Sequence, residues 1–284
     1  MSDSPNIAIS GMTRIVGVVG DPVTHSLSPR LHNAAYRALG LDYVYGAFPV
    51  RNGDFKAALD GARALGLVGL SVTTPHKYEA ARLADQRSAL VDALGAANTI
   101  VYQAGMSFAD ATDGAGLVDD LEQDAELALS GRTVAVLGAG GSAKAIVAAL
   151  AQQGVTEILV VNRTPARALE AAALAPGRAR VVELPETAGA SIVINATSVG
   201  LGADQAGASV SAGLAAHLHA GQLALDLVYR PARTPFLLRG EQNGAAVRNG
   251  LGMLVHQAAH QVQLFTGLAA PLAAMWASVR DQAE

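Results

Sequence analysis

The sequence predicts an α/β fold made of two domains. Segments rich in β-branched residues alternate along the chain with segments of helical periodicity, which is typical of α/β proteins. Between Thr133 and Leu150 a short apolar run breaks into glycines and continues as a helical pattern, the usual start of a dinucleotide-binding βαβ unit. With 284 residues, 51% of them hydrophobic, the chain is long enough for two sizeable cores.

The expected elements follow one another with short connections. Strands are expected at residues 14–20, 43–49, 67–72, 97–102, 133–137, 157–161, 191–195, 223–227 and 246–248. Helices are expected around residues 29–39, 53–64, 75–84, 114–124, 141–153, 165–174, 235–242, 251–265 and 271–281. Three of these helices should begin with a hydroxyl cap before a proline, at Ser28–Pro29, Thr74–Pro75 and Thr164–Pro165.

Composition excludes several classes of function. The net charge of −4 provides no basic surface for nucleic acid. No apolar run approaches the roughly 18 residues of a membrane span, and the N-terminus lacks the pattern of a signal peptide. The absence of cysteine excludes disulfides and thiolate metal sites. We therefore expect a cytoplasmic enzyme that binds neither nucleic acid nor membrane.

The glycine-rich stretch after residue 137 is the clearest sign of a ligand. Gly138 would form the tight turn, Gly140 would let the backbone approach a pyrophosphate, and Ala143 would allow close packing of helix on strand. The helix N-terminus would offer N–H groups to the phosphates. A glycine turn without a ligand is the alternative, because such turns are common after strands.

The end of the next strand indicates which dinucleotide is bound. An NAD-binding unit usually has Asp or Glu about 20 residues beyond the glycines, where it holds the ribose 2′-OH. This chain has Asn162 there, followed by Arg163, Thr164 and, one helical turn later, Arg167. Because a guanidinium group matches phosphate oxygens, these residues favour the 2′-phosphate of NADP.

Two later strands also end in polar loops. Residues 194–200 end a strand in small polar side chains that suit backbone contacts with a cofactor, and residues 226–231 form a second loop of this kind. Since α/β sheets bind ligands at the carboxyl ends of their strands, both loops should face the ligand.

The first third of the chain has hydroxyl groups and a lysine at helix starts. Ser26 and Ser28 precede a helix and would suit a carboxylate, although Ser28 could simply cap the helix. Lys77 lies in a first helical turn, where the dipole disfavours a cation and thereby favours proton exchange. An exposed, solubilising lysine is the alternative.

Two further polar residues flank an expected strand and its exit loop. Asn98 supplies both a donor and an acceptor for a hydroxyl group. Asp113 lies ahead of a helix, where it is either an N-cap or, if Lys77 lies beside it, a functional carboxylate.

Near the C-terminus, His256 and His260 are spaced as in a zinc-binding helix. The glutamate that such a helix requires is replaced by Gln257, and no third ligand is evident, so no metal is expected. A helix with its apolar side packed inward is favoured, with Gln257 able to face a ligand.

Together and in this order, these motifs resemble the shikimate dehydrogenase family. The resemblance extends from Gly17 to about Trp276. It rests on HSLSP at 25–29, VTTPHK at 72–77, AANT at 96–99, TDG at 112–114, GAGGSAKA at 138–145, NRT at 162–164, NATSVG at 195–200, DLVYRP at 226–231 with TPF at 234–236, and GLGMLVHQAAH at 250–260. Each motif alone is weak evidence, whereas nine in one order are specific.

The resemblance implies a discontinuous substrate-binding domain, residues 1–113 plus 250–284, and a Rossmann-like NADP-binding domain, residues 114–249. It places the active site in the cleft between them. It implies the reversible reduction of 3-dehydroshikimate to shikimate with NADPH, a step toward chorismate and the aromatic amino acids. The expected assembly is a monomer or a homodimer.

The same resemblance implies a role for each site residue. Lys77 would be the acid/base group, with Asp113 hydrogen-bonded to it and to the substrate. Ser26 and Ser28 would hold the substrate carboxylate, with Tyr229 nearby. The ring hydroxyls would be contacted by Thr73, Lys77, Asn98, Asp113 and Gln257. The cofactor would be bound by Gly138, Ala139, Gly140, Gly141, Ser142, Ala143, Asn162, Arg163, Thr164, Arg167, Ala196, Thr197, Ser198 and Gly250.

Two positions depart from the family pattern, because Ser71 and Ala111 stand where many members have Asn. The loss of two amides leaves open a quinate/shikimate-type dehydrogenase of broader substrate range, or an amino-shikimate substrate. A non-catalytic sensor of nucleotide and small acid is a third hypothesis, which the intact Lys77 and Asp113 argue against. A likeness to folate-linked dehydrogenases is one of fold alone.

Overall fold

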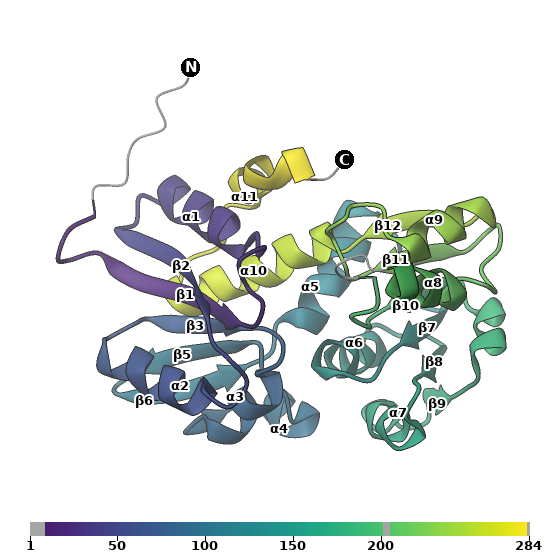
Figure 1. Ribbon diagram of the computed structural model, residues 1–284, viewed down its shortest axis with the longest axis horizontal. Coiled ribbons are helices and arrows are strands. Elements are labelled where there is room, and N and C mark those ends of the chain that lie inside the picture. The colour runs from purple at the N-terminus through teal and green to yellow at the C-terminus, as the bar shows by residue number, and fades with distance from the viewer. Residues whose placement is uncertain (1–8, 201–204, 283–284) are drawn as a thin grey trace. The chain divides into compact units, whose positions relative to one another are not determined.

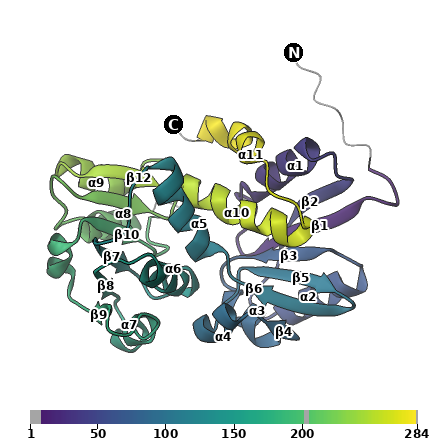
Figure 2. The ribbon, with the colours of Figure 1, turned by 180° about the vertical axis from the view of Figure 1, so that it is seen from behind.

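The computed structural model describes residues 9–200 and 205–282, which form two compact units. Unit 1 contains the described residues up to Thr112 together with Ala258–Asp281, and unit 2 contains Asp113–Gln257. Figure 1 shows the elements of each unit, and Figure 2 shows them from behind. The predicted domain boundaries after residues 113 and 249 compare with breaks after 112 and 257 in the structure.

Unit 1 is built on a six-stranded mixed sheet. Its strands lie in the order β2-β1-β3-β5-β6-β4. They are β1 (Arg14–Gly20), β2 (Tyr43–Pro49), β3 (Gly69–Val72), β4 (Gln86–Arg87), β5 (Thr99–Gln103) and β6 (Met106–Asp110). Strand β5 is antiparallel to both of its neighbours, whereas the other pairs are parallel.

Helices cover both faces of this sheet (Figure 1). One face packs against α1 (Ser28–Ala38) and α10 (Leu251–Thr266): His32 stacks on Tyr45, and Phe265 meets the backbone at Gly69. The other face packs against α2 (Phe55–Ala64), where Tyr102 donates to the Leu59 carbonyl. The remaining helices are α3 (Lys77–Leu83), α4 (Ala89–Leu94) and α11 (Leu272–Val279).

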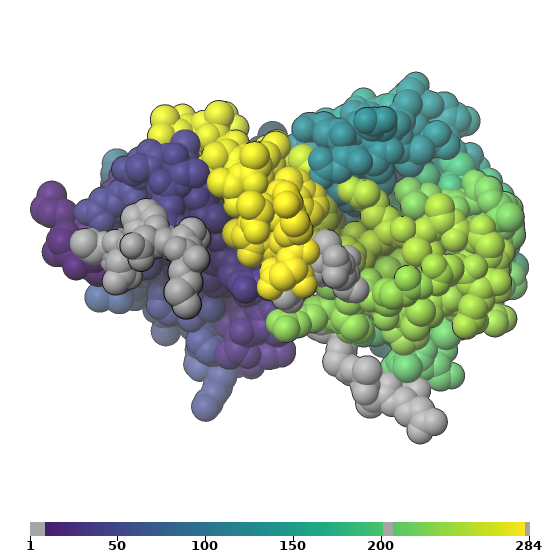
Figure 3. Space-filling view, turned by 90° about the horizontal axis from the view of Figure 1, so that it is seen from above, coloured from purple at the N-terminus to yellow at the C-terminus, as the bar shows by residue number. Residues whose placement is uncertain are grey.

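Helix α11 packs on α1 at the surface of unit 1 (Figure 3). The Arg30 guanidinium pairs with the Asp281 carboxylate at 3.1 Å, just beyond the end of α11. The last helix of the chain thus returns to the first.

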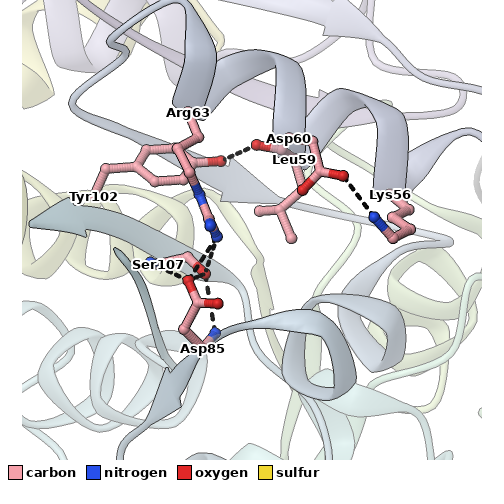
Figure 4. Close-up of polar contacts among 7 residues, drawn as sticks. All are labelled: Lys56, Leu59, Asp60, Arg63, Asp85, Tyr102 and Ser107. Atoms are coloured by element: carbon pink, nitrogen blue, oxygen red, sulfur yellow. Dashed lines mark hydrogen bonds and ion pairs between the residues drawn. The ribbon is translucent and has the colours of Figure 1, made fainter. Parts of the chain in front are cut away.

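A polar cluster fixes α2 to the strands below it (Figure 4). Arg63 donates to the Asp85 carboxylate at 2.6 Å and to Ser107 Oγ at 3.1 Å. Asp85 also accepts from the backbone N–H and the hydroxyl of Ser107, and these bonds hold the pKa of Asp85 below its usual value. The cluster therefore links α2, the loop after α3 and β6.

Unit 2 contains a second six-stranded sheet, and all of its strands are parallel. The order is β12-β11-β10-β7-β8-β9. The strands are β7 (Thr133–Leu137), β8 (Glu157–Val161), β9 (Ala179–Val181), β10 (Ile192–Asn195), β11 (Leu223–Asp226) and β12 (Ala246–Asn249). The predicted α/β class with a Rossmann-like parallel sheet is confirmed.

Alternate residues of the central strand of unit 2 enter two separate cores. Val134 and Val136 pack with Leu117 and Ile146, while Ala135 and Leu137 pack with the opposite set. Parallel strands buried on both faces are expected to be continuously apolar, as β7 is. The helical segments are α5 (Asp113–Asp119) with a π-helical turn at Asp120–Asp124, α6 (Gly141–Gln152), α7 (Pro165–Ala172), Leu184–Gly189, α8 (Gln205–Leu214), α9 (Pro235–Gln242) and the start of α10.

The capping prediction was wrong at α1 and α3, and at α7 it was confirmed only for the position of the cap. Ser28 lies inside α1, whose N-cap is Leu27, and α3 begins after His76 rather than Thr74. Thr164 is an N-cap by position, but its side chain makes no capping bond. At α9 (Pro235–Gln242), by contrast, the proline at the first position does follow a hydroxyl cap, because Thr234 accepts the Leu237 N–H. Ser88 likewise caps α4 by accepting the Val91 N–H.

Short elements escaped prediction, since they lack a clear apolar period. These are β4, β6, β9, α4, α8 and the segment Leu184–Gly189. None of the helices that the structure describes is long and apolar enough to cross a membrane.

Candidate active site

In unit 1, the predicted substrate residues gather at one edge of the sheet. Strands β1 and β3 end at this edge, and β5, which is antiparallel to β3, begins there. Ser28 follows β1, Thr73 follows β3, and Asn98 immediately precedes β5. The topology thus brings together side chains that lie 70 residues apart in the chain.

Ser26 and Ser28 form a short turn at the start of α1. The Ser26 hydroxyl accepts the Ser28 backbone N–H at 3.2 Å, and Ser28 itself is buried. Because Leu27 is the N-cap, the alternative that Ser28 serves only as a helix cap is wrong.

Lys77 is the first residue of α3, and its backbone is held on two sides. His76 is buried, its Nε2 meets the Val50 carbonyl at 2.7 Å, and its ring stacks on Phe55. The Lys77 carbonyl accepts the N–H of Ala97, in the loop that carries Asn98. His76 belongs to the motif at 72–77, but no role was predicted for it. In the structure, its contacts with Val50 and Phe55 fix the backbone directly before Lys77.

Asn98 is buried and its side chain has a fixed orientation. Its Oδ1 accepts from the Thr112 N–H at 2.8 Å and from the Thr99 hydroxyl at 3.0 Å, while Nδ2 donates to Thr112 Oγ1 at 2.9 Å. The expectation that Asn98 supplies both donor and acceptor needs correction, because the acceptor is already used within unit 1.

In unit 2 the glycine loop has the backbone geometry that close approach requires. Gly138 has φ 117°, which favours glycine, and a Cβ there would lie 3.0 Å from the Ala196 carbonyl. Gly140 is the N-cap of α6, and a Cβ at that position would meet open space. Ala143 is fully buried against the sheet.

Asp113 begins α5 and is tied to the glycine loop. The Ser142 hydroxyl donates to Asp113 Oδ2 at 2.8 Å. Helices α5 and α6 approach closely here, since a Cβ on Gly114 would overlap the Ala145 carbonyl. Asp113 is therefore the first residue of its helix and not an N-cap.

The end of β8 lies beside the glycine loop, because the Gly138 N–H donates to the Val161 carbonyl at 2.7 Å. Asn162 follows, and its side chain donates to the Thr164 carbonyl. Arg163 and Arg167 are exposed. The two arginines therefore lie at the strand end predicted to select the dinucleotide.

A buried carboxylate organises the two remaining loops of unit 2. Asp226 ends β11 and accepts from Asn195 Nδ2 at 3.1 Å, from the Val228 N–H at 3.0 Å and from the Thr234 hydroxyl at 2.6 Å. Asn195 Oδ1 in turn accepts from the hydroxyl and N–H of Thr197. Burial raises the pKa of Asp226 to about 6.

Asp226 thereby holds Thr197, through Asn195, on one side and Val228, the residue before Tyr229, on the other. The sequence motif included Asp226, but its role was not predictable, because a carboxylate at a strand end is usually exposed.

The first half of α10 packs tightly on α5. A Cβ on Gly116 of α5 would lie 2.5 Å from the Gln257 nitrogen of α10. Just before α10, Gly250 lies against the loop after β11, since a Cβ there would overlap the Leu227 carbonyl. The Gln257 side chain donates to the Leu254 carbonyl and is largely buried. His256 Nε2 lies within hydrogen-bond distance of Asp124 Oδ2, at 2.9 Å.

A second buried carboxylate braces the same helix pair. Asp120 is fully buried and pairs with Arg248 of β12, and a Cβ on Gly252 would overlap it. Burial raises the pKa of Asp120, while the Arg248 guanidinium opposes this shift.

Three domain descriptions of known proteins match this chain. The shikimate dehydrogenase substrate-binding domain matches residues 18–100, the shikimate/quinate 5-dehydrogenase domain matches 120–202, and the shikimate 5′-dehydrogenase C-terminal domain matches 250–280. The shikimate dehydrogenase (NADP(+)) of Geobacter sp. strain M21 is 39% identical over 277 residues, which cover 93% of this chain and 94% of that protein. The chain belongs to the shikimate dehydrogenase family.

Solved structures agree with this assignment. The shikimate 5-dehydrogenase of Thermus thermophilus, in complex with NADP(H) and shikimate, has a TM-score of 0.83 at 35% identity, covering 95% of this chain and 99% of that one. The 5-ketofructose reductase of Gluconobacter sp. strain CHM43 has a TM-score of 0.78 at 29% identity, covering 96% and 99%.

Unit 2 of this shikimate dehydrogenase family member fits a dinucleotide. The open space beside Gly140, the positive φ of Gly138 and the N-terminus of α6 match a pyrophosphate. Two exposed arginines follow β8, and no acidic residue occupies the ribose position. The two residues of the predicted catalytic pair belong to different units, Lys77 to unit 1 and Asp113 to unit 2.

Proposed function

We propose that this protein is an NADP-dependent shikimate dehydrogenase, which reversibly reduces 3-dehydroshikimate to shikimate on the route to chorismate and the aromatic amino acids. The observation that carries the proposal is the full-length match to NADP(+)-dependent shikimate dehydrogenases. The motifs of both units support it, since each expected site residue is present.

In this proposal, residues 1–113 with 250–284 bind the substrate and residues 114–249 bind the cofactor. Ser26 and Ser28 bind the substrate carboxylate, with Tyr229 beside it. Thr73, Asn98 and Gln257 contact the ring hydroxyls. The clustering of Ser28, Thr73 and Asn98 at one sheet edge supports the first part of this assignment.

Lys77 is the acid/base residue in this account. Bound NADPH supplies the hydride to the ring carbonyl carbon. As the carbonyl oxygen gains negative charge, Lys77 Nζ gives it a proton, and in the reverse direction Nζ takes the proton of the alcohol. Asp113 holds the substrate and the lysine in register, and the Ser142 hydroxyl orients Asp113 by donating to its Oδ2.

The cofactor assignment rests on charge at the end of β8. Arg163 and Arg167 bind the 2′-phosphate of NADP, with Asn162 and Thr164 alongside. Residues 138–143 bind the pyrophosphate, and Ala196, Thr197, Ser198 and Gly250 lie along the rest of the cofactor.

A dehydrogenase of broader substrate range is the second candidate. Ser71 and Ala111 lack the amides that many family members have, and the similar 5-ketofructose reductase acts on a different ketone. Quinate, which keeps the carboxylate and the ring hydroxyls, is the substrate to compare with shikimate.

A matrix of shikimate and quinate against NADP⁺ and NAD⁺ tests both candidates. Nicotinamide absorbance should rise fastest with shikimate and NADP⁺. A specificity constant for quinate equal to that for shikimate would favour the broader enzyme, and binding without turnover in every cell would favour a sensor. The cytoplasmic location and the monomer or homodimer state stay predictions, to be checked by fractionation and by light scattering.

A further inference from the structure

A row of buried, uncharged side chains runs between the unit 1 sheet and α10. Tyr45 on β2 reaches across β1 and donates to Ser71 Oγ on β3 at 2.6 Å. Ser71 donates to Gln261 Oε1 on α10 at 2.7 Å. Gln261 Nε2 donates to Thr99 Oγ1 at 3.0 Å and to the Asn98 carbonyl at 3.1 Å. Each of the five residues is at most 5% exposed.

The direction of these bonds follows from one backbone group. The Thr112 N–H can only donate, so the Asn98 atom that it meets is the acceptor Oδ1. The Thr99 hydroxyl, 3.0 Å from the same Oδ1, must also donate to it, which leaves the Thr99 lone pairs for Gln261 Nε2. Gln261 Oε1 then faces Ser71 and takes its hydrogen. All donors therefore point the same way along the row.

This arrangement uses the full acceptor capacity of the Asn98 side chain. An amide oxygen has two lone pairs, and Thr112 N–H and the Thr99 hydroxyl occupy both. Asn98 can consequently meet a substrate atom only as a donor, through Nδ2.

We propose that Tyr45, Ser71, Gln261 and Thr99, here called the relay, form a specificity-determining positioning network that makes Asn98 a donor only. The substrate atom opposite Asn98 must then carry a lone pair, so a hydroxyl or carbonyl oxygen is accepted and an ammonium group is rejected. This inference rests on the proposed function, in which Asn98 contacts the ring. It decides between shikimate and its amino analogues, a choice left open by the missing amides at Ser71 and Ala111.

The relay depends on the small size of Ser71. Its oxygen contacts the Tyr45 phenol at 2.6 Å and Gln261 at 2.7 Å, so an Asn at this position would occupy the space of the Gln261 amide. Helix α10 thus supplies, through Gln261, an amide that strand β3 lacks.

The donors and acceptors of the relay stay the same near neutral pH. Burial raises the pKa of Tyr45, and it lowers the pKa of His32, whose ring stacks on Tyr45 at 4.1 Å, to about 3. Both side chains are therefore uncharged near neutrality.

Thr99→Val and Thr99→Ser form a matched pair for the test. The valine keeps the shape but frees one lone pair of Asn98 Oδ1, whereas the serine keeps the hydroxyl. The measured quantity is kcat/KM with NADP⁺ for shikimate, 4-amino-4-deoxyshikimate and 5-amino-5-deoxyshikimate. The wild type should disfavour at least one amino analogue by about 100-fold or more, because an ammonium would face a donor.

In Thr99→Val the ratio of kcat/KM for shikimate to kcat/KM for the amino analogue should decrease about tenfold, and kcat/KM for shikimate itself should fall about fivefold. Thr99→Ser should stay within about twofold of the wild type. A folded Thr99→Val with unchanged discrimination overturns the relay. If Thr99→Val does not fold, Thr99→Ala, which removes the same hydroxyl from Asn98 Oδ1, is judged by the same ratio. Wild-type turnover of shikimate is measured alongside: its absence refutes the proposed function, whereas its presence with unchanged discrimination in the variants refutes the relay alone.

Discussion

The two units brace their functional edges with different chemistry. In unit 1, uncharged side chains hold the substrate edge, from Tyr45 through Gln261 to Asn98. In unit 2, buried carboxylates hold the loops, with Asp226 at the end of β11 and Asp120 between α5 and α10. Both arrangements satisfy buried polar groups, but only the second contains charge.

The difference predicts different responses to pH. An uncharged network of hydroxyl and amide groups does not titrate between about pH 4 and 8, whereas a buried carboxylate with a raised pKa does. The relay should therefore hold Asn98 in the same way over a pH range in which the loops of unit 2 change.

Lys77→Met should have the largest effect. Because Nζ is proposed to transfer the proton, kcat should fall about 1000-fold, while NADPH binding, which is assigned to unit 2, should not change. Initial rates and a fluorescence titration with NADPH measure the two quantities. Lys56→Met, at an exposed pair with Asp60, is the control. Turnover near the wild-type rate in Lys77→Met would show that the acid/base group lies elsewhere.

Asp226→Asn should alter how stability depends on pH. Between the ordinary pKa of 3.8 and the folded value of about 6, the unfolded chain loses the proton that the folded chain keeps. Wild-type stability therefore decreases as pH rises through this window, by at most about 3 kcal/mol, and the variant lacks this decrease.

Melting temperatures measured at about pH 4.5, near the lower end of this window, and at about pH 7.5, above it, test this directly. The melting temperature of Asp226→Asn, relative to that of the wild type, should be higher at pH 7.5 than at pH 4.5. The difference in melting temperature between Thr99→Val and the wild type should be the same at both pH values. A pH-independent difference for Asp226→Asn would remove the contrast between the units.

Arg163→Ala should separate the two nicotinamide cofactors. Loss of a charged hydrogen bond to the 2′-phosphate should raise KM for NADP⁺ about 10- to 30-fold and leave KM for NAD⁺ unchanged. Steady-state kinetics with both cofactors provide the measurement, and Arg239→Ala on α9 is the control. Equal effects on both cofactors would contradict the phosphate assignment.

Unit 1 also has an ionic cluster, but it lies away from the functional edge (Figure 4). Of the variants considered, Asp85→Asn in this cluster should have the smallest effect. The pKa of Asp85 is lowered, so its contribution is present at neutral pH and disappears as pH falls below 3.8. The pair is partly exposed, and a loss of about 2–4 °C in melting temperature is expected at neutral pH. Asp60→Asn, in an exposed pair on the same helix, should change less; an equal loss would deny the cluster any special role.

The sequence predicted the fold class, the family and the cofactor, because each depends on local patterns. The strand, glycine turn and helix at residues 133–150 are contiguous, and Arg163 follows the next strand directly. For the same reason β7 and β8 could be located to the residue, and β10, β11 and β12 to within one residue.

The supporting networks were not predictable, because their members are distant in sequence. Gln261 meets Ser71 across 190 residues, and Arg248 meets Asp120 across 128. Nothing in a local window distinguishes Gln261 from any other polar residue on an amphipathic helix. The missing amide at Ser71 was visible, but the side chain that replaces it was not.

A double-mutant cycle on Thr99→Val and Arg163→Ala tests the central claim, that unit 1 governs the substrate and unit 2 the cofactor. Thr99→Val should raise KM for shikimate only, Arg163→Ala should raise KM for NADP⁺ only, and the losses in the double variant should multiply within about twofold. A rise in KM for NADP⁺ caused by Thr99→Val, or a departure from multiplication of about fivefold or more, would contradict the division.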